Sequence, residues 1–111
     1  MEDRPEHLIH STLDADGVLL ATIDMPGRTM NVFSAGLMDA LDALMKRAER
    51  DDAVKSVVVT SGKPSFLAGA DLVMVRGYTE QARRATHDEM FATCGRLGRQ
   101  VVRIEERAKP W

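Results

Sequence analysis

One stretch, Ser61 to Asp71, contains most of the backbone positions in this sequence that could take part in chemistry. It follows a valine-rich run, residues 54–60, and precedes a helical pattern. In open α/β sheets, ligands bind in loops at the carboxyl ends of the strands. Ala68-Gly69-Ala70 is a run of three small residues, so a ligand can approach the main chain closely there. The stretch is therefore a candidate ligand site.

The chemistry available to this loop comes from backbone N–H groups near Asp71, where the next helix is predicted to start. The first N–H groups of a helix have no partner inside it and lie at the positive end of its dipole. Such donors stabilise an oxyanion that forms during a reaction, by about 3–4 kcal/mol per donor. The same residues also suit a helix start that Asp71 caps without any ligand. The residues alone leave both interpretations open.

Other patterns with known chemistry do not fit. The three histidines lack the spacing of a metal site, and the sequence has no CxxC or HExxH. Gly62-Lys63 lacks the earlier glycine and the following hydroxyl residue of a phosphate-binding P-loop. GxGxxG and GxSxG are also absent, and Ser65 beside a proline is typical of a turn. We therefore predict no metal site and no dinucleotide site in this sequence.

Hydrophobic periodicity predicts the elements that position the loop. Asp14 to Gly17 has the form of a hairpin turn. Residues 17–25 and 54–60 suit strands, and consecutive β-branched valines in the second indicate a strand covered on both faces. Between them, Ser34 suits the N-cap of an amphipathic helix with arginines at its end. This order predicts a βαβ unit with a right-handed crossover.

Beyond the loop the chain is predicted to be helical. Residues 72–75 suit one helical turn, which Gly77 interrupts. Residues 79–108 suit a helix that restarts at a capping box, residues 86–89. The polar face of this helix includes Gln100 and several arginines, and such a face is usually solvated.

Composition narrows the classes of function. The chain has 111 residues, 44% of them hydrophobic, and a formal net charge of -2, which suits one small globular domain or part of a larger one. This charge gives no footprint for nucleic acid. The single cysteine, Cys94, excludes an intrachain disulfide and is predicted to be a small buried hydrophobe. There is no apolar run of membrane-spanning length and no signal-peptide core, so we expect a cytoplasmic protein.

Two motifs carry a resemblance to a known family. Residues 66–72, Phe-Leu-Ala-Gly-Ala-Asp-Leu, after the valine-rich strand and Ser61-Gly62, resemble the crotonase (enoyl-CoA hydratase/isomerase) superfamily. Residues 23–34, Ile-Asp-Met-Pro-Gly-Arg-Thr-Met-Asn-Val-Phe-Ser, look like that family's first motif. Their Pro-Gly form is most similar to the hydratase portion of bacterial multifunctional fatty-acid oxidation proteins. Residues 107–111 look like the lead-in to the family's next core strand.

The resemblance implies a fold and a set of site residues. The fold would be an incomplete α/β crotonase fold (ClpP/crotonase-like) with ββα repeats. Residues 1–111 would be its N-terminal part, truncated before the second oxyanion-hole motif. Ala70 would be the catalytic residue, because its N–H would donate to a thioester carbonyl. The implied substrate-binding residues are Arg28 near the coenzyme A phosphates, Phe66, Leu67 and Ala68 along the coenzyme A channel, Gly69 at the turn, Ala70, and Asp71 as a structural cap.

The function implied for the complete parent protein is enoyl-CoA hydration in fatty-acid β-oxidation, a lyase reaction. The second oxyanion donor and the two catalytic glutamates are not among these 111 residues, so we expect the chain to be inactive alone. Another crotonase-type isomerase or hydrolase remains an alternative, as does a noncatalytic fragment that binds acyl-CoA or a partner. The residues leave the acyl chain length open.

The resemblance also bears on cofactors and partners. The acyl-CoA is the substrate, and no cofactor is expected in this segment. NAD is expected only if a 3-hydroxyacyl-CoA dehydrogenase domain follows in the parent. An oligomer is expected, with trimer-type packing or with a thiolase subunit if the parent is multifunctional. Neither nucleic acid nor an integral membrane segment is expected.

Overall fold

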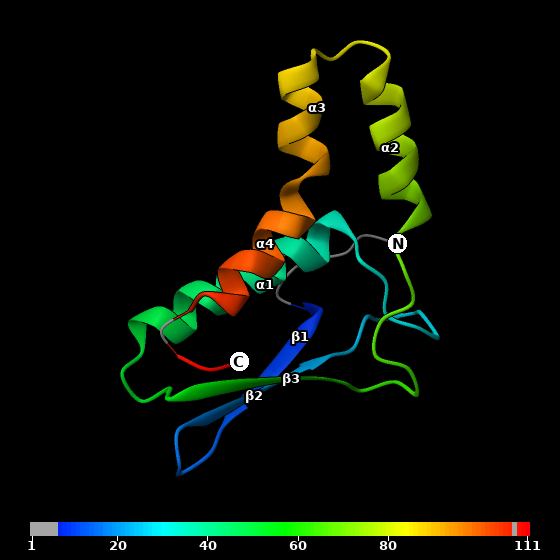
Figure 1. The fold of residues 1–111 in the computed structure, drawn as a ribbon. Coiled ribbons are helices and arrows are strands. Elements are labelled where there is room, and N and C mark those ends of the chain that lie inside the picture. Colours follow the sequence, from blue (N-terminus) through cyan, green and yellow to red (C-terminus); the bar gives the residue numbers. More distant parts are fainter. Residues whose placement is uncertain (1–6, 108) are drawn as a thin grey trace.

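The sheet of this protein has three strands. The computed structural model describes residues 7–107 and 109–111, with the strand order β1-β2-β3. β1 (Ile9–Leu13) and β2 (Val18–Ile23) are antiparallel, and β3 (Ser56–Ser61) runs parallel to β2 (Figure 1). The predicted hairpin and the predicted parallel pair of strands are both confirmed.

The turn between β1 and β2 has a local cause. Oδ1 of Asp14 accepts hydrogen bonds from the N–H groups of Asp16 and Val18, each at 2.9 Å, so the side chain closes the turn. Gly17 has a φ of +86°, a backbone conformation that residues other than glycine rarely adopt. A Cβ at this position would also lie 2.5 Å from Cγ of Lys55. Glycine is therefore required here for both backbone conformation and space.

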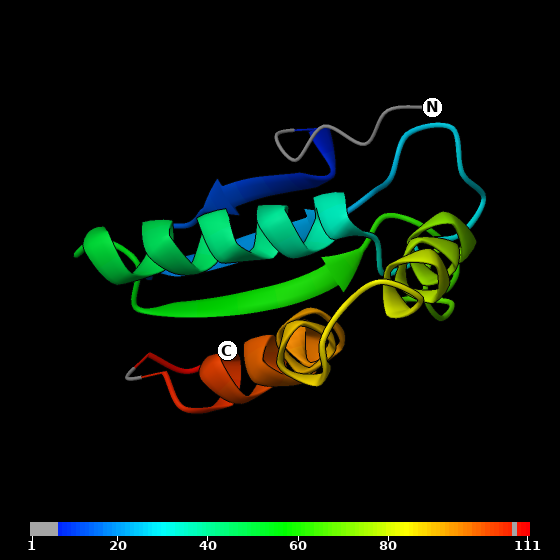
Figure 2. The same ribbon diagram turned by 90° about the horizontal axis from the view of Figure 1, so that it is seen from above.

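Helix α1 (Ala35–Arg50) connects β2 to β3 across one face of the sheet, as the βαβ prediction requires. It begins at Ser34, whose Oγ accepts a hydrogen bond from the Leu37 N–H at 3.1 Å. It ends at Asp51, whose N–H donates to the carbonyl of Arg47. Figure 2 shows α1 lying along the strands. The predicted N-cap and amphipathic helix are confirmed.

The core lies between α1 and the sheet and is aliphatic. Its buried side chains form one cluster: Leu8, Leu19, Ala21, Ile23, Met25, Leu37, Ala40, Leu41, Leu44, Ala48, Val54 and Val57. Complete burial of one valine or leucine side chain contributes roughly 1.5–3 kcal/mol. The cluster therefore fixes β2, α1 and β3 relative to one another, and with them the loops that leave the ends of β2 and β3.

The opposite face of the sheet is less covered than predicted. Leu20 and Val58 are neighbours in the β2–β3 register and are 40% and 47% exposed. No helix of the described chain lies over this face (Figures 1 and 2). Alternate side chains of a strand point to opposite faces, so Val57 is buried while Val58 is not. The prediction of a strand covered on both faces was wrong, because β-branched composition reports strand preference rather than burial.

Three helices follow the loop after β3. They are α2 (Leu72–Ala82), α3 (His87–Cys94) and α4 (Arg96–Glu105). α2 and α3 form a hairpin that projects from the sheet, and α4 lies beside α1 (Figure 1). The prediction that Gly77 interrupts α2 was wrong. A single helical glycine costs only about 1 kcal/mol relative to alanine, which the surrounding helix tolerates.

The single helix predicted over residues 79–108 is divided, with breaks between α2 and α3 and between α3 and α4. Its restart at Thr86 is confirmed. Oγ1 of Thr86 accepts from the Glu89 N–H at 3.2 Å, and Oε2 of Glu89 accepts from the Thr86 N–H at 3.3 Å, a capping box. Ala108 and the side chain of Cys94, which was predicted to be buried, lie outside the described residues.

A buried amide joins α4 to α1. Gln100 was predicted on a solvated face, but it is fully buried. Its Nε2 donates to the carbonyl of Met38 at 2.8 Å and to Oδ1 of Asp42 at 3.0 Å. Arg96 adds hydrogen bonds to Asp39 at 2.6 Å and Asp42 at 3.1 Å. The prediction failed because helical periodicity does not reveal that the polar side of α4 meets polar side chains of α1.

The same contacts set the ionisation of Asp42. Burial by itself raises its pKa, but the hydrogen bonds from Gln100 and Arg96 and the charges of Arg96 and Arg103 outweigh burial and lower the pKa below its ordinary value. The hydrogen bond to Asp39 raises the pKa of Arg96. Both side chains are therefore held in their charged forms.

The last described residues lie beside the free edge of β3. The N–H of Val57 donates to the carbonyl of Pro110 at 2.9 Å. Trp111, where a strand was predicted to begin, is not in a strand of the described chain. This one hydrogen bond joins the last described residues to β3.

Candidate functional site

Two loops meet at the end of the sheet where the carboxyl ends of β2 and β3 lie. β2 and β3 are parallel and pair Ile23 with Ser61, so their carboxyl ends lie side by side. The first loop, residues 24–34, and the second loop, residues 62–71, therefore leave the sheet at the same edge (Figure 1). This is the edge at which open α/β sheets bind ligands.

Backbone hydrogen bonds pair the second loop with the first. The Ala68 N–H donates to the carbonyl of Asn31 at 2.7 Å. The Phe33 N–H donates to the carbonyl of Gly69 at 2.8 Å, and the Asp71 N–H donates to the carbonyl of Phe33 at 2.7 Å. The two loops thus form a short parallel ladder.

Ala70 occupies a distinct place in this ladder, as the bridge partner of Phe33. In a parallel bridge, Phe33 bonds to the residues on either side of Ala70, so the N–H of Ala70 itself points away from the first loop. Within residues 7–107 and 109–111, no acceptor bonds to this N–H. Ala68, Gly69 and Ala70 are all exposed, and Gly69 has a φ of +74°. An unpaired donor therefore lies in an open stretch of small residues.

Asn31 joins the two loops from the protein interior. It is part of the motif at residues 23–34, but the sequence alone predicted no role for it. It is fully buried. Its Oδ1 accepts from the Met25 N–H at 3.0 Å. Its Nδ2 lies 2.9 Å from the carbonyl of Ile23, 2.9 Å from Oγ of Ser61 and 3.2 Å from the carbonyl of Phe66, and donates to them. Asn31 is the only asparagine in the sequence, and asparagine commonly bonds to backbone in loops, a signal that could have singled it out.

Charged side chains also connect the loops. Nζ of Lys63 lies 2.9 Å from Oδ1 of Asp24 and donates to the carbonyl of Arg28 at 2.7 Å. Nη1 of Arg28 lies 3.8 Å from Oδ1 of Asp71. Asp71 precedes α2, but its side chain makes no cap hydrogen bond, so its predicted capping role was wrong. The carboxylate faces Arg28 instead. Lys63 was not predicted to contribute, because ion pairing between loops is not visible in sequence.

Phe66 and Leu67 border an apolar groove. Phe66 is 52% exposed, and Leu67 is half-buried against the core. With Trp111 and side chains of the sheet, α1 and α4, they line a hollow of about 280 Å³. Gln100 also lines it, and its Oε1 is buried with no hydrogen-bond partner among the described residues.

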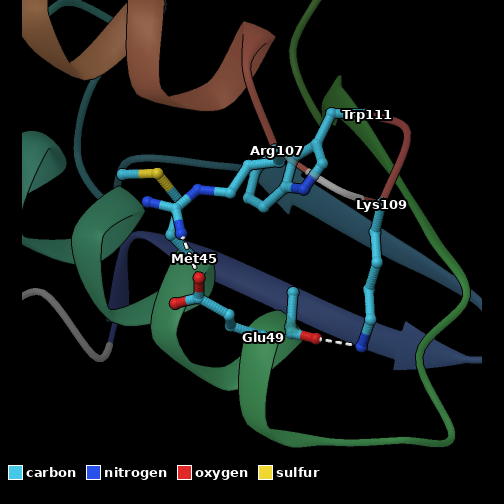
Figure 3. Close-up of a pocket in the computed structure, with 6 residues that line it drawn as sticks. Met45, Glu49, Arg107, Lys109 and Trp111 are labelled. Atoms are coloured by element: carbon cyan, nitrogen blue, oxygen red, sulfur yellow. Dashed lines mark hydrogen bonds and ion pairs between the residues drawn. The ribbon is translucent and has the colours of Figure 1, made fainter.

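A second hollow, of about 130 Å³, lies near the C-terminal end of α1. Figure 3 shows Arg107 reaching past Trp111 to Glu49, with which it forms an ion pair at 2.6 Å. Lys109 donates to the carbonyl of Ala48 at the end of α1. Both cations are engaged by α1, so this hollow serves to attach the last described residues and offers no chemistry comparable with the loop site.

Among the residues that the structure describes, no three or more His, Cys, Asp or Glu side chains gather to hold a metal ion. None of the described helices combines the length and apolar character needed to cross a membrane.

Sequence comparison identifies the family. The family model for enoyl-CoA hydratase/isomerase matches residues 14–97, which is more than half of the chain. This chain therefore belongs to the enoyl-CoA hydratase/isomerase (crotonase) family, as its motifs predicted. It is 51% identical over 63 residues to a fatty acid oxidation complex subunit alpha from Idiomarina loihiensis. It is 41% identical over 61 residues to the subunit of the same name from Shewanella amazonensis.

The solved structures agree on the fold. An enoyl-CoA hydratase from Shewanella pealeana superposes with a TM-score of 0.78 at 19% identity, over 94% of this chain and 37% of that one. An enoyl-CoA hydratase from Bacillus anthracis gives a TM-score of 0.68 at 19% identity, over 94% and 38%. The predicted α/β crotonase fold is thereby confirmed. The two curated relatives are much longer: the matches span 56% and 54% of this chain but 9% of each relative.

Proposed function

We propose that this chain forms the N-terminal part of a coenzyme A thioester site in an enoyl-CoA hydratase of fatty-acid β-oxidation. The observation that carries the proposal is the Ala70 N–H, which is unpaired within the described chain and lies beside the start of α2. Family membership and the names of the relatives support the substrate class.

The proposed chemistry of Ala70 follows from charge movement in the substrate. When water adds across the 2,3-double bond of an enoyl thioester, negative charge moves onto the carbonyl oxygen. A backbone donor held at that oxygen stabilises the charge as it develops, by about 3–4 kcal/mol. The positive end of α2 adds to this field. Ala70 is therefore the proposed catalytic donor.

The substrate-binding roles are proposed from the same geometry. Phe66 and Leu67 line the apolar hollow, and the exposed Ala68 lies two residues before the donor, so these three residues are proposed to contact the coenzyme A chain. The positive φ of Gly69 turns the chain next to the donor. Arg28 provides a cation for the coenzyme A phosphates, with its guanidinium held near Asp71. The proposed role of Asp71 is thus to orient Arg28.

We further propose that residues 1–111 alone do not hydrate crotonyl-CoA. Hydration needs a general base, a general acid and, in the mechanism proposed here, a second oxyanion donor. The glutamates of α2, α3 and α4 are exposed on helices, where Glu89 caps α3 and Glu80 pairs with Arg83, and none of them is proposed to be catalytic. No cofactor takes part in this reaction. NAD and a thiolase or identical subunit are proposed only for a longer parent protein, which the word complex in the relatives' name supports.

The donor can be removed without breaking a described hydrogen bond. Ala70→Pro eliminates the N–H, because proline has none, whereas the matched variant Ala68→Pro eliminates the bond to Asn31. Calorimetry would compare acetyl-CoA with free coenzyme A, which lacks the thioester carbonyl. We expect the wild-type chain to bind acetyl-CoA more tightly than coenzyme A. In Ala70→Pro, the ratio of the two dissociation constants should fall by about tenfold, while the melting temperature stays the same.

Two results would contradict the proposal. One is a wild-type chain that binds acetyl-CoA no better than coenzyme A. The other is an Ala70→Pro variant that is folded and retains the full preference. Hydration of crotonyl-CoA, followed by the loss of its conjugated absorbance, would separately contradict the proposed inactivity of the chain.

A further inference from the structure

We infer that Asn31 is a positioning residue that sets the register of the second loop, so that the N–H of Ala70, and not that of a neighbour, faces outward. This inference rests on the proposed function, because it explains what holds the proposed donor in place. Asn31 is fully buried, so it acts through the loop and does not contact the substrate.

The side chain of Asn31 connects three separate segments. It bonds to Ile23 and Met25 at the end of β2, to Ser61 at the end of β3, and to Phe66 in the second loop. The amide orientation follows from these partners. Oδ1 faces an N–H donor, and Nδ2 faces two carbonyls and a hydroxyl. One buried group therefore ties the second loop to the carboxyl ends of both strands.

Asn31 also bonds to the backbone of the second loop at two positions. Its side chain donates to the carbonyl of Phe66, and its carbonyl accepts from the N–H of Ala68. Because Phe66 and Ala68 are both bonded to Asn31, the residue of the second loop that follows in the ladder is fixed. Gly69 then accepts from Phe33, and Ala70 becomes the bridge residue.

Backbone pairing alone would not choose this register. Every residue here offers one N–H and one carbonyl, so a shift by one residue forms equivalent backbone bonds but turns a different N–H outward. Side chains in the ladder offer little discrimination, because Ala68, Gly69 and Ala70 are small and exposed. A Cβ added at Gly69 would meet no atom within 4 Å, so available space does not select the register, and the φ of +74° is the local feature that favours glycine at this position. The directional contacts of Asn31 add to this backbone preference.

Amide exchange measured by NMR on the full chain tests this inference. Asn31→Asp keeps the side-chain shape and the Oδ1 acceptor but, when ionised, loses both donors. Gln100→Met is the matched control, because it removes a different fully buried amide that bonds α4 to α1. The measured quantity is the protection of the Ala68 and Asp71 amides divided by that of amides in β2. We expect Asn31→Asp to lower this ratio by about tenfold or more, since buried carbonyls lose their donors.

The control and a rescue separate register from general stability. Gln100→Met is expected to lower the melting temperature and leave the ratio unchanged. Acidification of Asn31→Asp protonates the introduced carboxyl, restores one donor, and should recover part of the ratio. An unchanged ratio in Asn31→Asp at neutral pH, or no recovery on acidification, would overturn the inference. If Asn31→Asp is not folded at neutral pH, the recovery of the exchange ratio on acidification decides the question alone.

A binding arm distinguishes this inference from the proposed function. Asn31→Asp is expected to lose the preference for acetyl-CoA over coenzyme A about as far as Ala70→Pro does, whereas Asp42→Asn, which loses a charged contact with Arg96 between α1 and α4, keeps it. If the wild-type chain shows no preference, the proposed function fails, and the exchange ratio still decides whether Asn31 sets the register. If the wild type shows the preference and Asn31→Asp retains it in full, the positioning role fails and the proposed function stands.

Discussion

Nζ of Lys63 lies 2.9 Å from Oδ1 of Asp24, which links the loop after β3 to the first residue after β2. The Lys63 side chain is 12% exposed and that of Asp24 is 45% exposed. Gly62 leaves room for the pair, because a Cβ there would lie 2.8 Å from Oδ2 of Asp24. The arrangement of the two loops therefore depends on a partly buried charge pair as well as on the backbone ladder.

Replacing this lysine tests that dependence. Lys63→Met keeps the length of the side chain but removes its contacts with Asp24 and with the carbonyl of Arg28. We expect the free energy of unfolding, measured by urea denaturation, to fall by about 1–2 kcal/mol. The control is Arg83→Met, whose exposed pair with Glu80 at 4.0 Å should contribute about 0–0.5 kcal/mol. Equal losses in the two variants would contradict a special role for Lys63.

The contacts of Asp42 predict a pH dependence of stability. Its pKa is lower in the folded chain than in the unfolded chain, so its stabilising contribution is complete above the unfolded value of about 3.9. That contribution is lost as the pH falls through the folded pKa. Thermal melting from neutral pH into acid should show this loss in the wild type and a smaller loss in Asp42→Asn. Asp52→Asn, in the exposed turn after α1, is the control and should follow the wild type.

Removing the N-caps of α1 and α3 should lower the stability of the chain by different amounts. Ser34→Ala removes the cap of α1, which contributes most of the helical core, and is expected to cost about 1 kcal/mol in the free energy of unfolding. Thr86→Ala removes the matching bond at α3, in the projecting hairpin. We expect it to increase amide exchange in α3 while changing the global unfolding midpoint less. The reverse order would show that the hairpin contributes more to global stability than α1 does.

Two exposed glycines should respond to alanine in opposite directions. Gly77→Ala lies inside α2 with no atom within 4 Å of the new Cβ, so it should stabilise the chain by up to about 1 kcal/mol. Gly69→Ala also meets no atom, but its φ of +74° should make the change cost about 1–2 kcal/mol. Urea denaturation and circular dichroism measure both effects. Stabilisation by Gly69→Ala would mean that the loop does not keep this conformation in solution.

Local pattern predicted the elements that depend on neighbouring residues. The turn at Asp14–Gly17, the cap at Ser34 and the capping box at Thr86 were all confirmed, because each forms within a few residues of the chain. The predictions for Val58 and Gln100 were wrong, because exposure depends on which element stands opposite. The capping role of Asp71 was wrong for a related reason, since Arg28 from another loop lies near its carboxylate.

By itself, the sequence determined the family and the order of a β-hairpin, a helix, a parallel strand and a small-residue loop, because these follow from motifs and short-range periodicity. Only the tertiary structure showed that the parallel pairing of Ile23 with Ser61 brings the two loops together. It also showed that Asn31 joins them from inside and that the N–H of Ala70 is unpaired within the described chain. Hydrogen bonds between residues about 35 positions apart, such as that from Asn31 to Phe66, depend on the register of whole strands, which no local pattern specifies.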